Sequence, residues 1–456
     1  MIDRNKIEKW TLGYQLLRAS IRFAFKIFYR DLQIKGRENI PEGIPVIFAS
    51  NHQNSLMDAL AVLLNIKRQP VFLARSDIFK KRTIAKILTF MKIMPVYRIR
   101  DGFGTLGKNQ EIFEHTKRIL ENRKSIGLMP EGNHGDKHKL RPFVKGLFRI
   151  AFMGQEKFGK QPGVKIIPVG LDYSDYPAFR SSLLIRYSTP MEVADFYDDY
   201  QENQALGIRK CRERLSERLS DEIIDISNPK FYNAFDHLRR LYQIPMLKRL
   251  NIKGRTLNDR FKAEKKTIYF LEKETESNVQ NIEELDNLVK TYLALSKRFK
   301  LNYRIFEKKK YNWFLLIIKG LFLFLTIPVL LYGFLTNIIA VKVIEKSTSI
   351  LKDKQFVSSV KLVAGFIIFL FYYILLWIIA AILIEGALYP FLLFISLPVV
   401  GFLALKHHEL SVDTIHKMKY NYLNKRNRNS FAQLKATINM IIRKIDSIVS
   451  EQEKKS

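Results

Sequence analysis

The stretch that decides the fold is Val46-Ile47-Phe48-Ala49-Ser50-Asn51-His52-Gln53-Asn54-Ser55-Leu56-Met57-Asp58. Its first part, residues 46–50, is typical of a buried strand, and residues 55–64 favour a helix. The polar residues between them form a turn at the carboxyl end of the strand. A strand that leads directly into a helix in this way is the repeating unit of a parallel sheet.

The same alternation continues over residues 44–190. Further strands are predicted at residues 71–74, 94–98, 126–129, 164–169 and 183–187, and further helices at residues 78–91, 109–122 and 143–158. This predicts an α/β domain over residues 36–200, with a mostly parallel central sheet flanked by helices. Ligands of such sheets bind outside the carboxyl ends of the strands.

Composition points to a membrane as the partner. The chain has 456 residues, 76 Lys and Arg against 44 Asp and Glu, and a net charge of +32. Such a charge favours anionic partners. The long apolar runs after residue 312 are unlike a soluble nucleic-acid binder, so we expect a bilayer with anionic headgroups and no nucleic acid. A single cysteine, Cys211, excludes an intrachain disulfide, and we expect it on the surface of a helix.

The second half of the chain predicts three further regions. Residues 201–312 form a helical accessory segment, residues 313–406 a hydrophobic membrane region, and residues 407–456 a basic helical tail. Apolar runs at residues 320–341, 362–384 and 387–405 approach the ~20 residues that span hydrocarbon. Because basic loops prefer the cytoplasm, we expect a cytoplasmic catalytic domain, a re-entrant or interfacial first run, and a hairpin turning at Glu385-Gly386.

The N-terminal residues 1–35 predict an amphipathic, membrane-associated helix. Four basic residues recur at every fourth position, and aromatic residues fill much of the remaining surface. The basic residues are Arg18, Arg22, Lys26 and Arg30. Such a helix suits a membrane interface. The alternative is an ordinary helix packed on the core.

The turn after the first strand carries a candidate catalytic pair, His52 and Asp58. A histidine acts as a general base toward a hydroxyl group when a carboxylate binds its far nitrogen and fixes its tautomer. Arg98 and Arg100 end another predicted strand, and arginine suits phosphate through paired hydrogen bonds. These residue types together indicate a transferase that acts on an alcohol.

A second polar turn follows the strand at residues 126–129. It reads Pro130-Glu131-Gly132-Asn133-His134, and a basic stretch with Lys137, Lys139, Arg141 and Lys145 comes after it. Glu131 is placed to accept a hydrogen bond from a substrate hydroxyl, and Gly132 allows close backbone approach. His134 and His138 with Glu131 and Asp136 are a formal metal set, but we expect no metal because no further ligand is evident.

The order of these segments resembles the glycerolipid acyltransferase superfamily, the PlsC-like acyltransferases. The family motifs correspond to His52 with Asp58, Pro95–Arg98, Pro130–Gly132 and Ile166–Val169, within residues 36–190. Five residues separate His52 from Asp58, and in this spacing the chain resembles the long fungal glycerol-3-phosphate/dihydroxyacetone-phosphate acyltransferase branch. Three further segments look like that branch: Gly170–Tyr173, Phe179–Ser181 and Tyr187–Pro190.

The resemblance implies direct transfer of an acyl group from acyl-CoA or an acyl-carrier protein, with no other cofactor. His52 would take the proton from a glycerol hydroxyl, and Asp58 would orient it. Arg98 would hold the substrate phosphate, Glu131 and Gly132 would position the glycerol, and Arg100 and Arg180 are further candidates for the phosphate. The acceptor would be glycerol-3-phosphate or its 1-acyl form. The alternatives are another lysolipid, such as an amino-acid lipid, and an inactive lipid-binding scaffold.

Overall fold

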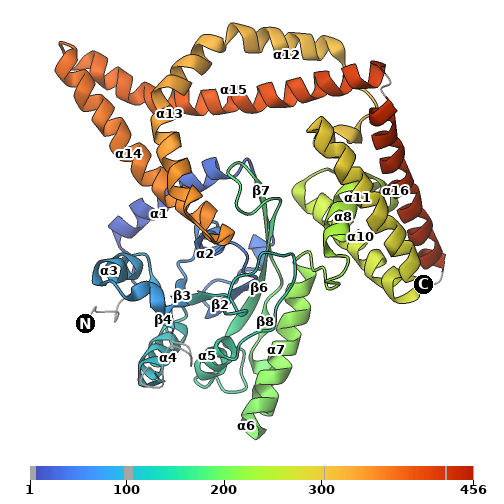
Figure 1. The fold of residues 1–456 in the computed structure, drawn as a ribbon. Coiled ribbons are helices and arrows are strands. Elements are labelled where there is room, and N and C mark those ends of the chain that lie inside the picture. The colour runs from blue at the N-terminus through green and yellow to red at the C-terminus, as the bar shows by residue number, and fades with distance from the viewer. Residues whose placement is uncertain (1–6, 97–105, 302, 427–428, 455–456) are drawn as a thin grey trace. The chain divides into compact units, whose positions relative to one another are not determined.

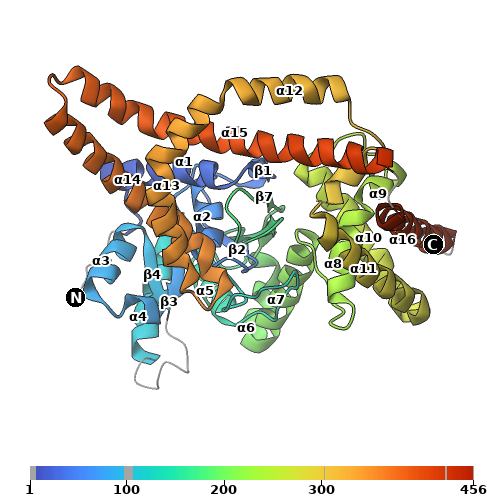
Figure 2. The ribbon, with the colours of Figure 1, turned by 45° about the horizontal axis from the view of Figure 1, so that its top comes forward.

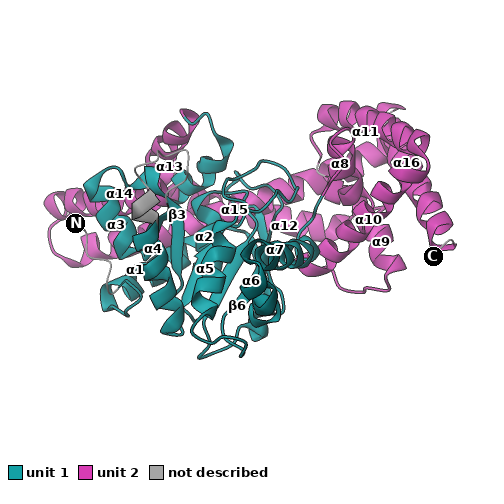
Figure 3. Cartoon of the chain, turned by 90° about the horizontal axis from the view of Figure 1, so that it is seen from below, with its two compact units in different colours: residues 1–225, 351–362 teal, residues 226–350, 363–456 magenta. Residues whose placement is uncertain are grey.

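In the computed structural model, the described residues are 7–96, 106–301, 303–426 and 429–454. The chain forms two compact units (Figure 3). The sheet unit contains residues 1–225 and 351–362, and the helical unit contains residues 226–350 and 363–456. Residues 351–362 therefore fold with a domain that ends far earlier in the sequence.

A mostly parallel sheet forms the centre of the sheet unit. Among the described residues its strands follow the order β1-β7-β6-β2-β5-β3-β4, and β8 also pairs with β6. All pairs are parallel except β6 with β7 and β6 with β8. The strands are β1 (Asp31–Lys35), β2 (Val46–Ser50), β3 (Val71–Arg75), β4 (Ile93–Val96), β5 (Ser125–Leu128), β6 (Lys165–Tyr173), β7 (Ser182–Tyr187) and β8 (Met191–Glu192). The predicted α/β fold class is confirmed.

Helices cover both faces of this sheet (Figure 1). Along β2, Val46 and Phe48 join a hydrophobic cluster with α1 and α2, whereas Ile47 and Ala49 join a second cluster with α4, α5 and α7. This is the alternation of side chains that a strand imposes. The helices are α1 (Leu12–Phe28), α2 (Leu56–Leu64), α3 (Arg82–Phe90), α4 (Leu106–Glu121), α5 (Gly146–Gln155), α6 (Tyr197–Glu202) and α7 (Gln204–Asp221), with 3-10 turns η1 (Arg37–Asn39), η2 (Ser76–Phe79) and η5 (Ala194–Phe196).

Helix α1 is packed on the core to a greater extent than the sequence indicates. Phe25 and Phe28 are buried among the residues of α2 and the sheet. Arg18, assigned from the sequence to a membrane-facing basic row, is buried and donates hydrogen bonds to the carbonyls of Leu63, Ile66 and Arg68. The guanidinium therefore supplies donors to backbone carbonyls at and just after the carboxyl end of α2. Large apolar side chains of the helix and its start remain exposed: Trp10, Leu12, Leu16 and Phe23.

The structure divides the chain at a different place from the sequence analysis. Helix α7 lies in the predicted accessory segment, yet it packs on β6 and α5 within the sheet unit. Its Cys211 is completely buried, not on the surface, because it belongs to the apolar face that covers the sheet. Burial raises the pKa of this thiol to about 12. The sheet unit therefore extends to residue 225 rather than residue 200.

The helical unit consists of a polar bundle and a set of apolar helices. In the bundle, α16 packs against α8, α10 and α11. The bundle helices are α8 (Tyr232–Leu241), α9 (Gln243–Arg249), α10 (Leu257–Ser277), α11 (Val279–Phe299) and α16 (Asn429–Lys454), with a 3-10 turn η6 (Tyr303–Glu307). The apolar helices are α12 (Trp313–Leu325), α13 (Ile327–Ser349), α14 (Val357–Leu383) and α15 (Leu388–Arg426), and η7 (Lys354–Phe356) precedes α14.

Three helices of the described residues are long and apolar enough to cross a membrane: residues 327–349, 354–383 and 388–426. Helices α14 and α15 are joined by a tight turn (Figure 2), in which Gly386 has a φ of 85°. The predicted run at residues 320–341 is broken at Thr326 into α12 and α13. With 13 residues, α12 is only about 20 Å long, less than the ~30 Å of hydrocarbon.

Small residues hold α13 against α15. A side chain added at Gly333 would collide with the carbonyl of Val400 and with Ala404. Close contact of backbones at such residues is how apolar helices associate without a hydrophobic driving force. Asn337 lies in the same contact, where its amide donates to Gly333 O and accepts a bond of 2.6 Å from the hydroxyl of Tyr373.

Candidate active site

The carboxyl end of β2 brings His52 and Asp58 together. His52 follows the strand directly, and Asp58 lies in the first turn of α2. His52 Nδ1 is 2.8 Å from Asp58 Oδ2. The carboxylate is completely buried, whereas the imidazole side chain retains 17% of its exposure. A buried carboxylate on Nδ1 places the proton there, so the Nε2 atom is left as the base.

Asp58 is surrounded by further donors. The backbone N–H groups of Gln53 and Asn54 donate to Oδ2 at 2.9 and 2.8 Å, and the hydroxyl of Tyr173 donates to Oδ1 at 2.6 Å. Burial, followed by the nearby Asp58, raises the pKa of Tyr173 well above its usual value, so the phenol stays protonated and remains a donor. These bonds fix the carboxylate in one orientation and stabilise its charge.

The turn that carries His52 is held at both of its ends. Asn51 exchanges two hydrogen bonds with the backbone of Leu171 in β6, at 3.0 and 2.8 Å. Ser55, just before α2, has a φ of 47°, in the left-handed region that non-glycine residues rarely adopt. This conformation reverses the chain within the turn, so that the amides of Gln53 and Asn54 both reach the carboxylate of Asp58.

Glu131 supports the backbone of His52. Its Oε1 accepts from the His52 N–H at 2.9 Å, and its Oε2 accepts from Arg141 Nε at 2.6 Å. Burial raises the pKa of Glu131, and Arg141 opposes that rise. Both oxygens already have donors within the protein. The structure therefore gives this carboxylate a supporting position, where the sequence analysis expected it to bind a substrate hydroxyl.

Arg141 completes the support from the other side. Its Nη2 donates to the carbonyl of His52 at 3.1 Å and to that of Asn133. Both backbone polar groups of His52 are therefore held by the Glu131–Arg141 pair. Gly132 lies in the same turn with a φ of 66°, and a side chain added there would press on Val144 at 3.1 Å. The glycine therefore allows the turn to close.

A second imidazole lies beside the first. The ring centroids of His134 and His52 are 5.5 Å apart, in an edge-on arrangement. Burial and the neighbouring His52 lower the pKa of His134. His134 Nε2 is buried and has no hydrogen-bond partner among the described residues. The described part of the chain contains no group of three or more His, Cys, Asp or Glu side chains arranged to hold a metal ion.

Of the three arginines predicted to bind phosphate, the structure describes Arg180. Arg98 and Arg100 lie outside the described residues. Arg180 Nη1 donates to the carbonyls of Ile27 and Tyr29, at 2.6 and 3.4 Å. The structure therefore uses the Arg180 guanidinium to hold the end of α1, and we no longer assign it to the substrate. The backbone of Arg180 reinforces this contact, since its N–H donates to Phe28 O at 2.8 Å.

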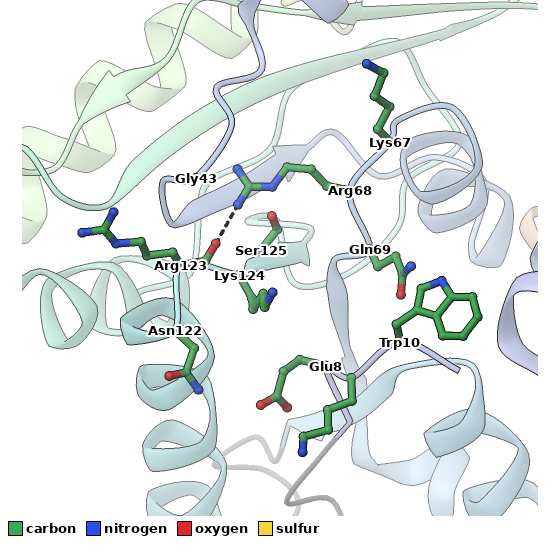
Figure 4. A pocket seen from close by; sticks show the side chains of 11 residues that line it. Glu8, Trp10, Gly43, Lys67, Arg68, Gln69, Asn122, Arg123, Lys124 and Ser125 are labelled. Carbon is green, nitrogen blue, oxygen red and sulfur yellow. Dashed lines mark hydrogen bonds between the residues drawn. The ribbon is translucent and has the colours of Figure 1, made fainter. Parts of the chain in front are cut away.

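A basic cavity of about 850 Å³ lies at the other end of the sheet (Figure 4). Its wall includes Gly43, Gln69 and Ser125, which precede or begin β2, β3 and β5, so it is at the amino ends of these strands. The dashed bond in Figure 4 joins the Arg68 guanidinium to the Arg123 carbonyl at 2.9 Å. This cavity is therefore separate from His52, which follows the carboxyl end of β2.

Sequence reasoning did not assign Tyr173 to the site, and it named Arg141 only in a basic stretch and His134 only in a formal metal set, without linking either to His52. Tyr173 closes the segment Gly170–Tyr173 that resembles the fungal branch, and Arg141 and His134 stand in the polar stretch after Glu131. All three were therefore present in stretches already singled out. Their partners could not be identified, because each contact joins residues from separate parts of the chain.

Comparisons with known proteins find relatives of the part of the chain that holds this site. A family model described as "Acyltransferase" matches residues 31–172, so this part of the chain is an acyltransferase domain. The chain is similar to glycerol-3-phosphate O-acyltransferase 2 of Saccharomyces cerevisiae, with 21% identity over 52% of this chain and 46% of the relative. It is also similar to a chloroplastic 1-acyl-sn-glycerol-3-phosphate acyltransferase of Brassica napus, with 29% identity over 32% of this chain and 38% of the relative.

The matched region spans less than half the length of either of these relatives. The chain is also similar to a solved structure, that of the 1-acyl-sn-glycerophosphate acyltransferase PlsC from Thermotoga maritima. It is 20% identical and covers 48% of this chain and 83% of its own, with a TM-score of 0.32. The predicted resemblance to the acyltransferase superfamily is confirmed by the family model and the named relatives.

Proposed function

From the premise that residues 31–172 are an acyltransferase domain, we propose that this chain is a membrane-bound O-acyltransferase. It transfers a fatty acyl group from an acyl thioester to a hydroxyl group of glycerol-3-phosphate or 1-acylglycerol-3-phosphate. Acylation of 1-acylglycerol-3-phosphate gives phosphatidic acid, and acylation of glycerol-3-phosphate gives a precursor of phosphatidic acid. The names of the relatives support both acceptors.

The contact between His52 Nδ1 and Asp58 Oδ2 at 2.8 Å carries this proposal. With its Nδ1 proton held by a buried carboxylate, the imidazole presents a basic Nε2 to a substrate hydroxyl. Positioned general bases of this kind contribute typically 10²–10⁴-fold to a rate, so most of the pair's effect is on kcat.

The reaction proceeds in two steps, and the proton taken from the acceptor hydroxyl ends on the leaving thiol. As His52 Nε2 takes the proton of the acceptor hydroxyl, the oxygen attacks the thioester carbonyl and forms a tetrahedral intermediate. The carbon–sulfur bond then breaks, and the imidazolium returns the proton to the leaving thiolate. The acyl group passes directly to the acceptor, with acyl-CoA or an acyl-carrier protein as the donor and no further cofactor.

We propose that basic residues of the segment that follows β4 in the sequence bind the substrate. Arg98 is the proposed phosphate clamp, because a guanidinium pairs with phosphate through two parallel hydrogen bonds. Arg100 is the second candidate for this role. Gly132 is proposed to help position the glycerol, because it lies in the turn whose Glu131 holds the backbone of His52.

The apolar helices α13, α14 and α15 support a membrane location. We propose that the catalytic domain lies on the cytoplasmic face of a bilayer with anionic headgroups. The net charge of +32 favours such a surface. Lipid acceptors, and products that remain in the bilayer, are consistent with this location.

The test uses the full chain, purified and reconstituted in phospholipid vesicles. Labelled acyl-CoA and acyl-carrier protein are each supplied with four acceptors: glycerol-3-phosphate, dihydroxyacetone phosphate, 1-acylglycerol-3-phosphate and a lysolipid that carries an amino acid. We expect transfer to a glycerol phosphate acceptor, loss of that transfer in His52→Ala, and wild-type activity in the exposed control Lys160→Ala. Transfer only to the amino-acid lysolipid, or to none of the acceptors, would refute the proposal.

A further inference from the structure

Residues 351–362 fold with the sheet unit, although its other residues end at residue 225. We call them the inter-helix segment, because they join α13 to the body of α14. They belong to the sheet unit, whereas the residues on either side belong to the helical unit (Figure 3). Both neighbouring helices are among those apolar enough to cross a membrane.

The inter-helix segment is anchored in the core of the sheet unit. Leu362 is buried in the hydrophobic cluster that α1 and α2 also form. Lys361 Nζ donates to the carbonyl of Pro177 at 3.4 Å. Ser358 and Ser359 are both buried. The end of the segment, from Ser358 to Leu362, is therefore packed into the domain, whereas residues 352–354 are exposed.

One contact of the segment reaches the catalytic imidazole through a second ring. The Phe356 ring lies 5.2 Å from the His134 ring, centroid to centroid, at an interplanar angle of 89°. His134 in turn lies 5.5 Å from His52. Edge-to-face contacts of this kind favour one mutual orientation of the rings. Phe356 therefore restrains His134, whose ring contacts that of His52.

A second contact reaches the catalytic carboxylate. Ser358 Oγ donates a hydrogen bond to Asn54 Oδ1, and both side chains are fully buried. The amide of the same Asn54 side chain donates to Tyr176 O at 2.9 Å. The Asn54 backbone N–H donates to Asp58 Oδ2 at 2.8 Å. Ser358 thus fixes a residue whose main chain holds Asp58.

We propose that Ser358 and Phe356 are positioning residues of the acyl-transfer site, supplied by the inter-helix segment. The inference rests on the function proposed above, and it extends the site to a part of the chain with no acyltransferase motif. Loss of the Ser358 hydroxyl leaves the side-chain oxygen Oδ1 of Asn54 buried without this donor. The turn at residues 51–54 then relaxes, and Asp58 holds His52 less well.

The segment that positions the site is covalently continuous with α13 and α14. Residues 356 and 358 are bound to the site by a ring contact and a hydrogen bond within one compact unit, and mutations can break both contacts.

The experiment compares Ser358→Ala with Ser359→Ala in the full chain in vesicles. The two serines are adjacent and buried, but Ser359 Oγ has no hydrogen-bond partner among the described residues. We expect Ser358→Ala to lower kcat by about tenfold to a hundredfold, because small displacements of a catalytic group have effects of this size. The KM values for both substrates should stay within about twofold, and the pH profile of kcat should change. Ser359→Ala should behave as wild type in each measurement.

A second measurement needs no enzymatic activity. Diethyl pyrocarbonate modifies unprotonated imidazoles, and mass spectrometry of the peptides separates His134 from His52. We expect Phe356→Ala to increase the rate of modification of His134 by at least about threefold, since its edge-on partner is gone. Phe356→Leu, which keeps an apolar side chain there, should show a smaller increase.

The two measurements distinguish the failure of this inference from failure of the proposed function. Equal kcat values and pH profiles for Ser358→Ala and Ser359→Ala in an active enzyme would overturn the positioning role of Ser358. An unchanged rate of His134 modification in Phe356→Ala would overturn the role of Phe356. If wild-type protein transfers no acyl group but Phe356→Ala still exposes His134, the contact is upheld and the proposed function fails.

Discussion

The hydroxyl of Tyr173 donates a hydrogen bond of 2.6 Å to Asp58 Oδ1, although the two residues are 115 positions apart. Tyr173 ends β6, which pairs directly with β2, so the register of the two strands brings the phenol to the carboxylate. His52, Asp58 and Tyr173 therefore form a continuous chain of hydrogen bonds from the partly exposed imidazole into the core.

Tyr173→Phe should lower kcat by about tenfold with little change in KM, because the bond to Asp58 acts on the orientation of the base and not on substrate binding. Loss of a buried hydrogen bond should also cost about 1–3 kcal/mol of stability. Steady-state kinetics and thermal unfolding measure the two effects. Tyr187→Phe is the control, since the hydrogen bond of the Tyr187 hydroxyl to Val62 O, at 3.4 Å, is long. Equal kinetics in the two variants would contradict the role of Tyr173.

Arg141→Lys should be nearly as inactive as Arg141→Ala. The guanidinium contacts Glu131, His52 O and Asn133 O at once, and an ammonium group cannot reproduce that planar arrangement. We expect kcat to fall by about tenfold or more in both variants. Lys145→Ala removes an exposed cation from the same basic stretch and should retain wild-type kcat. Full activity in Arg141→Lys would show that charge alone is needed.

His134 should make the protein less stable in mild acid. Its folded pKa is lowered, mainly by burial and then by His52, with Asp353 opposing and Arg141 and Arg75 adding to the decrease. As the pH falls, the unfolded imidazole takes up a proton first, near its usual pKa of about 6.5. Stability is therefore lost as the pH falls from that value toward the folded pKa.

His134→Gln removes this contribution. The decrease in Tm between pH 7.5 and pH 5.5 should be smaller in His134→Gln than in the wild type. Thermal unfolding of both proteins in the same detergent measures it. The same decrease in both proteins would mean that other groups cause the acid sensitivity.

Arg18→Ala should destabilise the sheet unit. Its guanidinium donates to three carbonyls near the end of α2, at 2.7, 2.6 and 2.9 Å, and their loss leaves buried acceptors without donors. We expect a decrease in Tm of about 3 °C or more. Lys26→Ala removes an exposed cation from the same helix and should change Tm little. If both variants unfold at the wild-type temperature, α1 does not depend on this anchor.

The inter-helix segment predicts a membrane topology. Because residues 351–362 fold within the sheet unit, a cysteine at position 352 should be labelled from the same side of the membrane as one at the exposed position 160. A cysteine at position 385, in the turn between α14 and α15, should be labelled from the opposite side. The measurement uses a membrane-impermeant maleimide on sealed vesicles. The native Cys211 is buried and should not react. Labelling of positions 352 and 160 from opposite sides would exclude this topology.

Patterns that are local in the sequence predicted much of the fold. The strand at residues 46–50 has the bounds of β2, and the predicted strand at residues 183–187 lies within β7. Apolar side chains recur with a period that depends only on neighbouring residues, so these elements can be identified without the tertiary fold. The short strand β1 was not predicted. Its residues alternate poorly and become a strand by pairing with β7.

The site was predicted only in part. The spacing of His52 and Asp58 is fixed by one turn and one helix, so the pair follows from local sequence. The functions of Glu131 and Arg180 do not, because a polar side chain binds whichever partners the fold brings to it. In this structure those partners are the backbone of His52 for Glu131, and the carbonyls of α1 for Arg180.

The amino-acid sequence by itself determined the alternating α/β domain, the imidazole with its carboxylate, and the apolar helices, since each depends on residues close together in the chain. The tertiary structure alone decided that Tyr173 holds Asp58, that Arg141 holds His52, and that Phe356 and Ser358 reach the same turn. Strand register and the packing of a distant segment set these contacts, and neither leaves a periodic signal in the sequence.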